Sequence, residues 1–163
     1  MNFWKYRAGN VYTGNAYNFD SEEELYYNWA KDLHQGVMNQ KQDRIGDVRN
    51  YKTKNDVKAM RPDHPGRAAN AWAICNEMEV GDVVFSIGHG DEILGVGIVT
   101  GSYFYDDTDG SRLHKRPVKW VEEKYCAKHG FQQGSLSKFN LKNPAALSTL
   151  NHLLELYGME ECI

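Results

Sequence analysis

Aromatic and basic side chains lie close together between residues 103 and 119, and their types suit binding chemistry. Tyr103 and Tyr105 flank Phe104, so in an extended chain the two tyrosines share one face and the phenylalanine takes the other. Exposed rings can stack on a flat group, and stacking on a nucleobase contributes ~1–3 kcal/mol. The following residues suit contacts to phosphate: His114, Lys115, Arg116 and Lys119.

Both features also have ordinary explanations. Two tyrosines at the edge of a sheet are common on protein surfaces, and the basic residues could balance the acidic turn at residues 106–110. A second basic run could border the same face if the chain closes suitably; it contains Arg49, Lys52, Lys54 and Lys58.

No constellation of residues predicts catalysis. The six histidines have no metal-like spacing, and no nucleophile has a base partner at a recognisable distance along the chain. The acidic turn at residues 106–110 lacks the glutamate that completes a calcium loop. The three cysteines are far apart and indicate reduced thiols rather than a zinc site. We therefore expect no catalytic residue, no metal, no cofactor and no enzymatic activity.

The elements that must position the candidate residues are strands between residues 78 and 121. Turn signals at Gly81-Asp82 and Gly88–Asp91 separate runs of β-branched and aromatic residues. Gly95 and Gly97 share one strand face, which indicates a bend or the close approach of another group. This region predicts a bent antiparallel meander with strands at residues 83–87, 93–99, 103–105 and 116–121.

Helices are expected around these strands. Ser21 and Glu24 form a capping box before an apolar stripe, and Pro144 suits the first position of a last helix. The expected helices cover residues 22–34, 56–60, 67–78, 122–129 and about 144–157. We also expect a strand at residues 2–6, a loop at residues 10–20, an edge strand at residues 137–140, and one domain over residues 1–163.

The order of these pieces resembles a known family. Residues 78–121 resemble the N-terminal recognition domains of McrB-like modification-dependent restriction systems. The shared order is a GD-V-V strand start, a turn, ILGVGIVTG-Y-Y, an acidic loop and H-R-V-W. Those domains belong to the PUA-like superfamily, with EVE and YTH domains as relatives. The resemblance implies an α+β fold, a PUA-like bent antiparallel β-barrel of five or six strands with helices packed around it.

The resemblance also implies a pocket for a base. Where the family commonly has a tryptophan, this sequence has Met38, whose thioether can contact a base but offers no flat wall. Residues 45–51 resemble a GDL…Y segment of the family, and Trp72 lies on an expected helix where core packing is the alternative. The expected base-binding residues are Met38, Arg49, Asn50, Tyr51, Trp72, Tyr103, Tyr105, His114, Lys115, Arg116 and Lys119.

Composition limits these expectations. The net charge of −3 argues against general electrostatic binding to nucleic acid, so binding requires local basic patches. No run approaches the ~18 apolar residues of a membrane-spanning helix, and the first residues do not have the pattern of a secretion signal. We expect a cytoplasmic protein with no membrane partner.

The functional expectation is a non-enzymatic module that binds nucleic acid, with DNA favoured over RNA. It would read a modified, methylated base flipped into an aromatic pocket, as in modification-dependent restriction, together with an effector nuclease or NTPase. The alternatives are an RNA-binding PUA-like reader, a small ASCH-type hydrolase on the same barrel, and an interaction domain that uses the aromatic residues to bind a protein partner.

Overall fold

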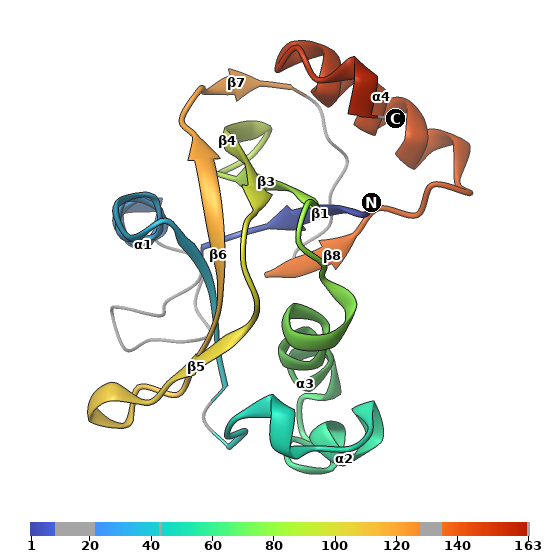
Figure 1. Cartoon of the computed structure of the whole chain (residues 1–163). Helices are drawn as coiled ribbons and strands as arrows, with labels where there is room; N and C mark the ends of the chain where they lie inside the picture. The colour runs from blue at the N-terminus through green and yellow to red at the C-terminus, as the bar shows by residue number, and fades with distance from the viewer. Residues whose placement is uncertain (9–21, 43, 128–134, 163) are drawn as a thin grey trace.

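A curled β-sheet organises the chain, and helices pack against it (Figure 1). The computed structural model describes residues 1–8, 22–42, 44–127 and 135–162. The mixed α+β class is confirmed, and the sheet forms a half-barrel. The loop expected at residues 10–20 lies outside the described residues.

The strands are β1 Phe3–Tyr6, β2 Val37–Lys41, β3 Val83–Ile87, β4 Glu92–Val99, β5 Phe104–Asp106, β6 Leu113–Val121, β7 Tyr125–Cys126 and β8 Leu136–Lys138. The helices are α1 Glu22–Gln35, α2 Lys54–Ala59, α3 Pro65–Trp72 and α4 Pro144–Leu156. Shorter helical turns are η1 Val48–Asn50, η2 Ala73–Glu77, η3 Thr108–Gly110 and η4 Glu160–Cys162, of which η2 is π-helical and continues α3. None of the helices in the described residues is long and apolar enough to cross a bilayer.

The sheet differs from the expected barrel in strand number and direction. Within the described residues it has eight strands, in the order β2-β6-β4-β3-β1-β8, with β5 beside β6 and β7 beside β4. The expectation of five or six strands was therefore wrong. The sheet is also not wholly antiparallel, because β1 runs parallel to β3, with Trp4 opposite Val84. Residues far apart in sequence make this pairing, which local patterns cannot reveal.

A second correction concerns the helix expected at residues 122–129. The described part of that segment contains the short strand β7 instead, in which Tyr125 pairs with Ile93 of β4. Pairing with an existing sheet here outweighs the weak local helix signal. The other expected helices are present with shifted ends, and α4 starts at Pro144 as expected, after the Asn143 side chain caps its first turn.

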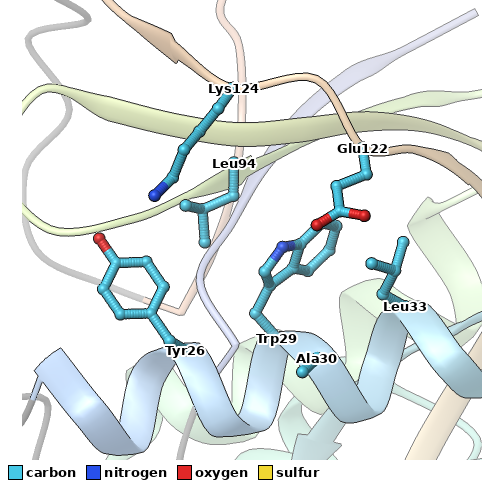
Figure 2. Close-up of a pocket in the computed structure, with 7 residues that line it drawn as sticks. All are labelled: Tyr26, Trp29, Ala30, Leu33, Leu94, Glu122 and Lys124. Atoms are coloured by element: carbon cyan, nitrogen blue, oxygen red, sulfur yellow. The ribbon is translucent and has the colours of Figure 1, made fainter.

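Two tryptophan rings fill the space that the glycines of β4 leave open. A Cβ atom on Gly95 would lie 3.2 Å from the Trp29 ring of α1, and one on Gly97 would lie 2.6 Å from the Trp120 ring of β6. The two indoles meet edge to face, with centroids 4.8 Å apart. Figure 2 shows α1 turning Trp29 toward the sheet beside Leu94. The expected close approach of another group is confirmed.

Side chains occupy the edge of β2 that faces away from β6. Tyr6 Oη accepts a hydrogen bond from the Asn39 backbone N–H at 3.1 Å and donates one to Asp32 Oδ2. Asn39 Nδ2 donates to Asp32 Oδ1 at 2.6 Å. All three residues are buried, Tyr6 at 0% exposure and the other two at 1%. This network joins β1, α1 and β2 where the sheet does not close through its backbone.

The same edge continues through a second set of side-chain bonds. The Gln40 amide accepts a hydrogen bond from Ser135 Oγ at 2.9 Å, and Asn70 Nδ2 donates to that hydroxyl at 3.0 Å. Trp120 Nε1 donates to the Val37 carbonyl oxygen at 3.0 Å. Gln40 Nε2 also donates to the Asn39 carbonyl oxygen at 3.0 Å. Side chains thus occupy the Asn39 N–H and the Val37 and Asn39 carbonyl oxygens, and these groups are not available to pair with another chain.

We expect Tyr6→Phe to lower the free energy of unfolding by ~1–3 kcal/mol, because it removes one hydrogen bond from the buried Asn39 N–H and one from the buried Asp32 carboxylate. Urea denaturation measures the change. Tyr27→Phe is the matched control, since Tyr27 is 49% exposed. Equal stability of the two variants would contradict the role of Tyr6 at the edge of β2.

Candidate nucleic-acid interface

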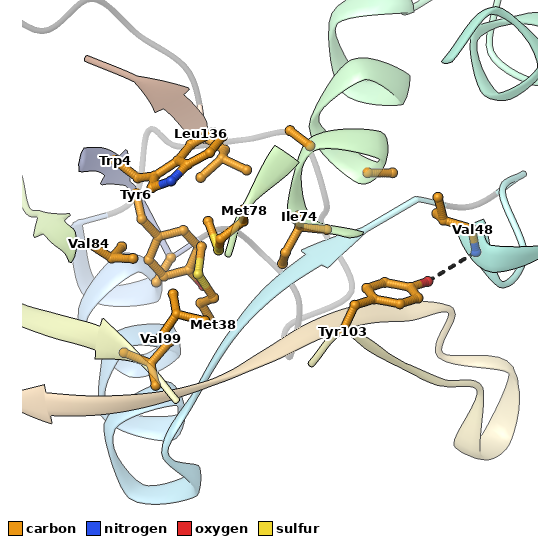
Figure 3. Close-up of a cluster of buried hydrophobic side chains, with 14 of the residues drawn as sticks. Trp4, Tyr6, Met38, Val48, Ile74, Met78, Val84, Val99, Tyr103 and Leu136 are labelled. Carbon is orange, nitrogen blue, oxygen red and sulfur yellow. Dashed lines mark hydrogen bonds between the residues drawn. The ribbon is translucent and has the colours of Figure 1, made fainter. Parts of the chain in front are cut away.

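Tyr103 ties the β5–β6 hairpin to η1. It directly precedes β5 and is only 5% exposed. Its Oη accepts a hydrogen bond from the Val48 backbone N–H at 3.1 Å and lies 2.7 Å from His114 Nδ1. Figure 3 shows the ring reaching from the hairpin to Val48. The Tyr103 side chain therefore has a structural role, and only a small part of its ring is accessible to a ligand.

His114 is a buried, neutral imidazole. It lies on β6 with no exposed surface, and its ring stacks on that of Tyr103 with centroids 5.9 Å apart. Tyr103 Oη and His114 Nδ1 share one hydrogen bond, and the tautomer of the imidazole decides which of the two groups donates. Burial lowers the pKa of His114 to about 4, and the Ile45 backbone and the Asp47 carboxylate offset only part of this effect.

Arg49 presents a cation at the surface above Tyr103. Asp47 begins η1, and its carboxylate accepts a hydrogen bond from the Arg49 backbone N–H. The Arg49 guanidinium pairs with that carboxylate at 2.6 Å and lies 5.8 Å from the centre of the Tyr103 ring. The hydrogen bond from Arg49 lowers the pKa of the Asp47 carboxyl. The pair is preorganised and exposed, and it leaves guanidinium N–H groups for a ligand.

Three of the expected aromatic residues have accessible rings. Tyr105 is half-buried beside His114, with ring centroids 5.2 Å apart, so both tyrosines of the hairpin face His114 as the strand alternation predicted. Tyr51 follows η1 and Trp72 ends α3, and each packs half-buried against the same core. Asn50 is exposed between Arg49 and Tyr51. Two exposed polar side chains, Arg49 and Asn50, therefore lie directly before the half-buried ring of Tyr51.

Two of the expected basic residues on β6 have partners within the protein. Arg116 is 4% exposed and donates from Nη1 to the carbonyl oxygens of Met78 at 3.0 Å and Ile74 at 3.3 Å. Lys115 is 8% exposed and pairs with Asp106 at 3.0 Å. Lys119 is exposed. Of these three, Lys119 is the cation best placed to meet a phosphate.

Met38 lies inside the core. It has no exposed surface, and it packs in the hydrophobic cluster that also contains Tyr6 and Tyr103 (Figure 3). A base could enter between Met38 and Tyr103 only if the core repacked. A site for a base therefore fits better on the outer surface of η1 and the hairpin.

The sequence did not reveal the hydrogen bonds that build this surface. Tyr103 and His114 are eleven residues apart, and Tyr103 and Val48 are 55 apart. The hairpin register, with Tyr105 opposite His114, follows once the turn at residues 107–112 is known. Asp47 next to Val48-Arg49 was a recognisable capping signal. Among the described residues, no three His, Cys, Asp or Glu side chains are grouped so that they could hold a metal ion.

The His114 environment predicts a pH-dependent stability. The pKa of His114 is about 4 in the folded protein, against 6.5 for an ordinary histidine. Between pH 4 and pH 6.5 this histidine is therefore protonated in the unfolded chain and neutral in the folded protein. Stability should therefore fall as the pH drops from about 6.5 to about 4, by up to about 3 kcal/mol. Urea unfolding at several pH values measures this slope.

His114→Gln is the comparison variant, because it cannot gain this proton. It should be less stable than wild type at pH 7, and the difference should shrink toward pH 4. A constant difference across this range would contradict a neutral buried His114.

Comparison with known proteins gives one finding. A family model described as a domain of unknown function (DUF8426) matches residues 4–150. No curated protein and no solved structure matches the chain.

Proposed function

We propose that this chain, which belongs to the DUF8426 family, is a non-enzymatic module that binds nucleic acid and reads a modified base turned out of the stack. The observation that carries the proposal is the surface around η1. There the exposed guanidinium of Arg49 lies over Tyr103, and the partly exposed rings of Tyr51 and Tyr105 pack against the same core.

A PUA-like arrangement is part of the proposal. The curled sheet, with α1 against it (Figure 1) and η2 bonded to Arg116 of β6, is compatible with such a fold. The sequence order over residues 78–121 is the further support. The departures are the parallel pairing of β1 with β3 and the buried Met38.

Each group on this surface has a distinct role in the proposed complex. Tyr105 and Tyr51 offer faces on which a base can stack. Arg49 and Asn50 offer hydrogen-bond donors and an acceptor for the edge of that base. Lys52, which is exposed next to Tyr51, can meet a phosphate, which positions the strand without reading its sequence. Lys119 lies farther along β6, opposite Ile98, where only a longer stretch of nucleic acid could meet it.

The free energies limit how selective such a site can be. Turning a base out of a duplex costs a few kcal/mol, and stacking on one ring returns ~1–3 kcal/mol. Burying one methyl group adds ~0.8 kcal/mol, which is less than a tenfold preference. A surface site formed by half-exposed rings should therefore bind a modified base with modest selectivity.

We propose DNA rather than RNA as the ligand, and an effector nuclease or NTPase as the partner that acts after recognition. The support for both is the resemblance to modification-dependent restriction domains. Single-stranded RNA is the direct competitor, since its unpaired bases stack on rings without the cost of extrusion.

The test compares Tyr105→Ala with Tyr105→Phe. Fluorescence anisotropy would measure their binding to matched duplexes with and without a methylated base, and to single-stranded RNA. The alanine variant should lose ~1–3 kcal/mol for the methylated duplex, because it removes the ring. The phenylalanine variant, which keeps the ring, should bind like wild type.

Three outcomes would overturn the proposal. Equal losses on methylated and unmethylated duplexes would exclude base reading by Tyr105. Tighter binding to RNA than to either duplex would favour the RNA-binding alternative. Absence of binding to all three ligands by wild type would exclude a nucleic-acid function for this chain.

A further inference from the structure

We propose that a groove between α1 and the end of β6 binds a small organic amine: a positively charged ammonium group on an apolar body. The groove has a volume of about 420 Å³, which falls in the range of ligand pockets, ~300–1,000 Å³. The site does not depend on the proposed binding of nucleic acid.

Apolar side chains form the walls of the groove. Tyr26, Trp29 and Leu33 lie along one side of α1 and point toward the sheet, where Leu94 of β4 faces them (Figure 2). Ala30 is exposed between them, so its small side chain leaves room above the helix. These residues can cover the apolar body of a ligand.

One end of the groove already holds an ammonium group of the chain itself. Lys124 Nζ lies 4.8 Å from the centre of the Tyr26 ring and 2.5 Å from Glu92 Oε1. The Tyr26 hydroxyl donates a hydrogen bond to the other oxygen of Glu92. A ring face and a carboxylate are the two features that attract organic cations, and here they bind one.

The other end has a carboxylate without a cation. Glu122 follows β6, is exposed, and lines the groove opposite Lys124 (Figure 2). In the described residues it forms no ion pair. An incoming ammonium can pair with Glu122 while the attached apolar body lies over Ala30 and Leu33.

The local charge also selects the ligand. Two of the described residues that line the groove carry a charge, Glu122 and Lys124, and Lys124 is already paired with Glu92, so the carboxylate of Glu122 leaves a net negative charge. This acidic surrounding repels the phosphates of a nucleic acid and attracts a cation. The groove is therefore distinct from the surface around η1.

The test uses three probes with one ring and different charge: 2-phenylethylamine, 2-phenylethanol and 3-phenylpropanoate. Isothermal titration calorimetry with the whole chain should show saturable binding of the amine. The neutral alcohol should bind about threefold to fivefold more weakly, as expected for the loss of one exposed ion pair, and the anion weaker still. Equal binding of the amine and the alcohol, or no binding of the amine, would overturn the proposal.

Two variants locate the binding. Glu122→Gln should lower amine affinity to that of the alcohol and leave alcohol binding unchanged. Ala30→Leu, which suits a helix and fills the groove, should weaken both. The control Glu155→Gln removes the same charge from α4, and it should change neither. Unchanged amine binding in both Glu122→Gln and Ala30→Leu would place the amine elsewhere and contradict the proposal.

Discussion

The contact on which the rest of the structure depends is the buried network of Tyr6, Asn39 and Asp32. It lies at the edge of β2, the first strand of the described sheet order, and it satisfies the Asn39 N–H with a phenol oxygen. A buried carboxylate is costly unless it is hydrogen-bonded, and Asp32 receives bonds from both Tyr6 and Asn39. The network therefore ties β1 to α1 and β2, which follow each other directly in the sequence.

The position of β2 determines the surface around η1. β2 pairs with the first half of β6, and β5 pairs with the same half of β6. This places His114 between Gln40 and Tyr105, inside the protein, where burial keeps it neutral and its Nδ1 shares a hydrogen bond with the Tyr103 hydroxyl. The Tyr103 hydroxyl in turn accepts a hydrogen bond from the Val48 N–H, which fixes the first residue of η1. Arg49, the next residue, is therefore exposed on a helical turn whose position is fixed. The exposed groups of the proposed interface thus rest on buried hydrogen bonds, which suits a site that must hold its geometry.

Local patterns predicted the elements well and their partners poorly. Strand alternation placed β3, β4 and the two faces of residues 103–105, and the capping residues placed α1 and α4. The parallel pairing of β1 with β3 and the two-residue strand β7 have no local signal, since both exist only through contacts with distant residues. The site shows the same division. The sequence identified the aromatic and basic residues of the candidate site. Two of them have structural roles instead: Arg116 donates hydrogen bonds to the carbonyl oxygens of Ile74 and Met78, and Met38 is buried in the hydrophobic core.

The most direct test of the functional account is a two-dimensional NMR titration of the labelled chain with a methylated duplex. The account predicts that backbone amide shifts change first at Arg49, Asn50 and Tyr51, together with Tyr105. It predicts smaller changes with the unmethylated duplex at the same positions, and none on α4. Shift changes confined to other surfaces, or identical changes with both duplexes, would contradict base reading at η1.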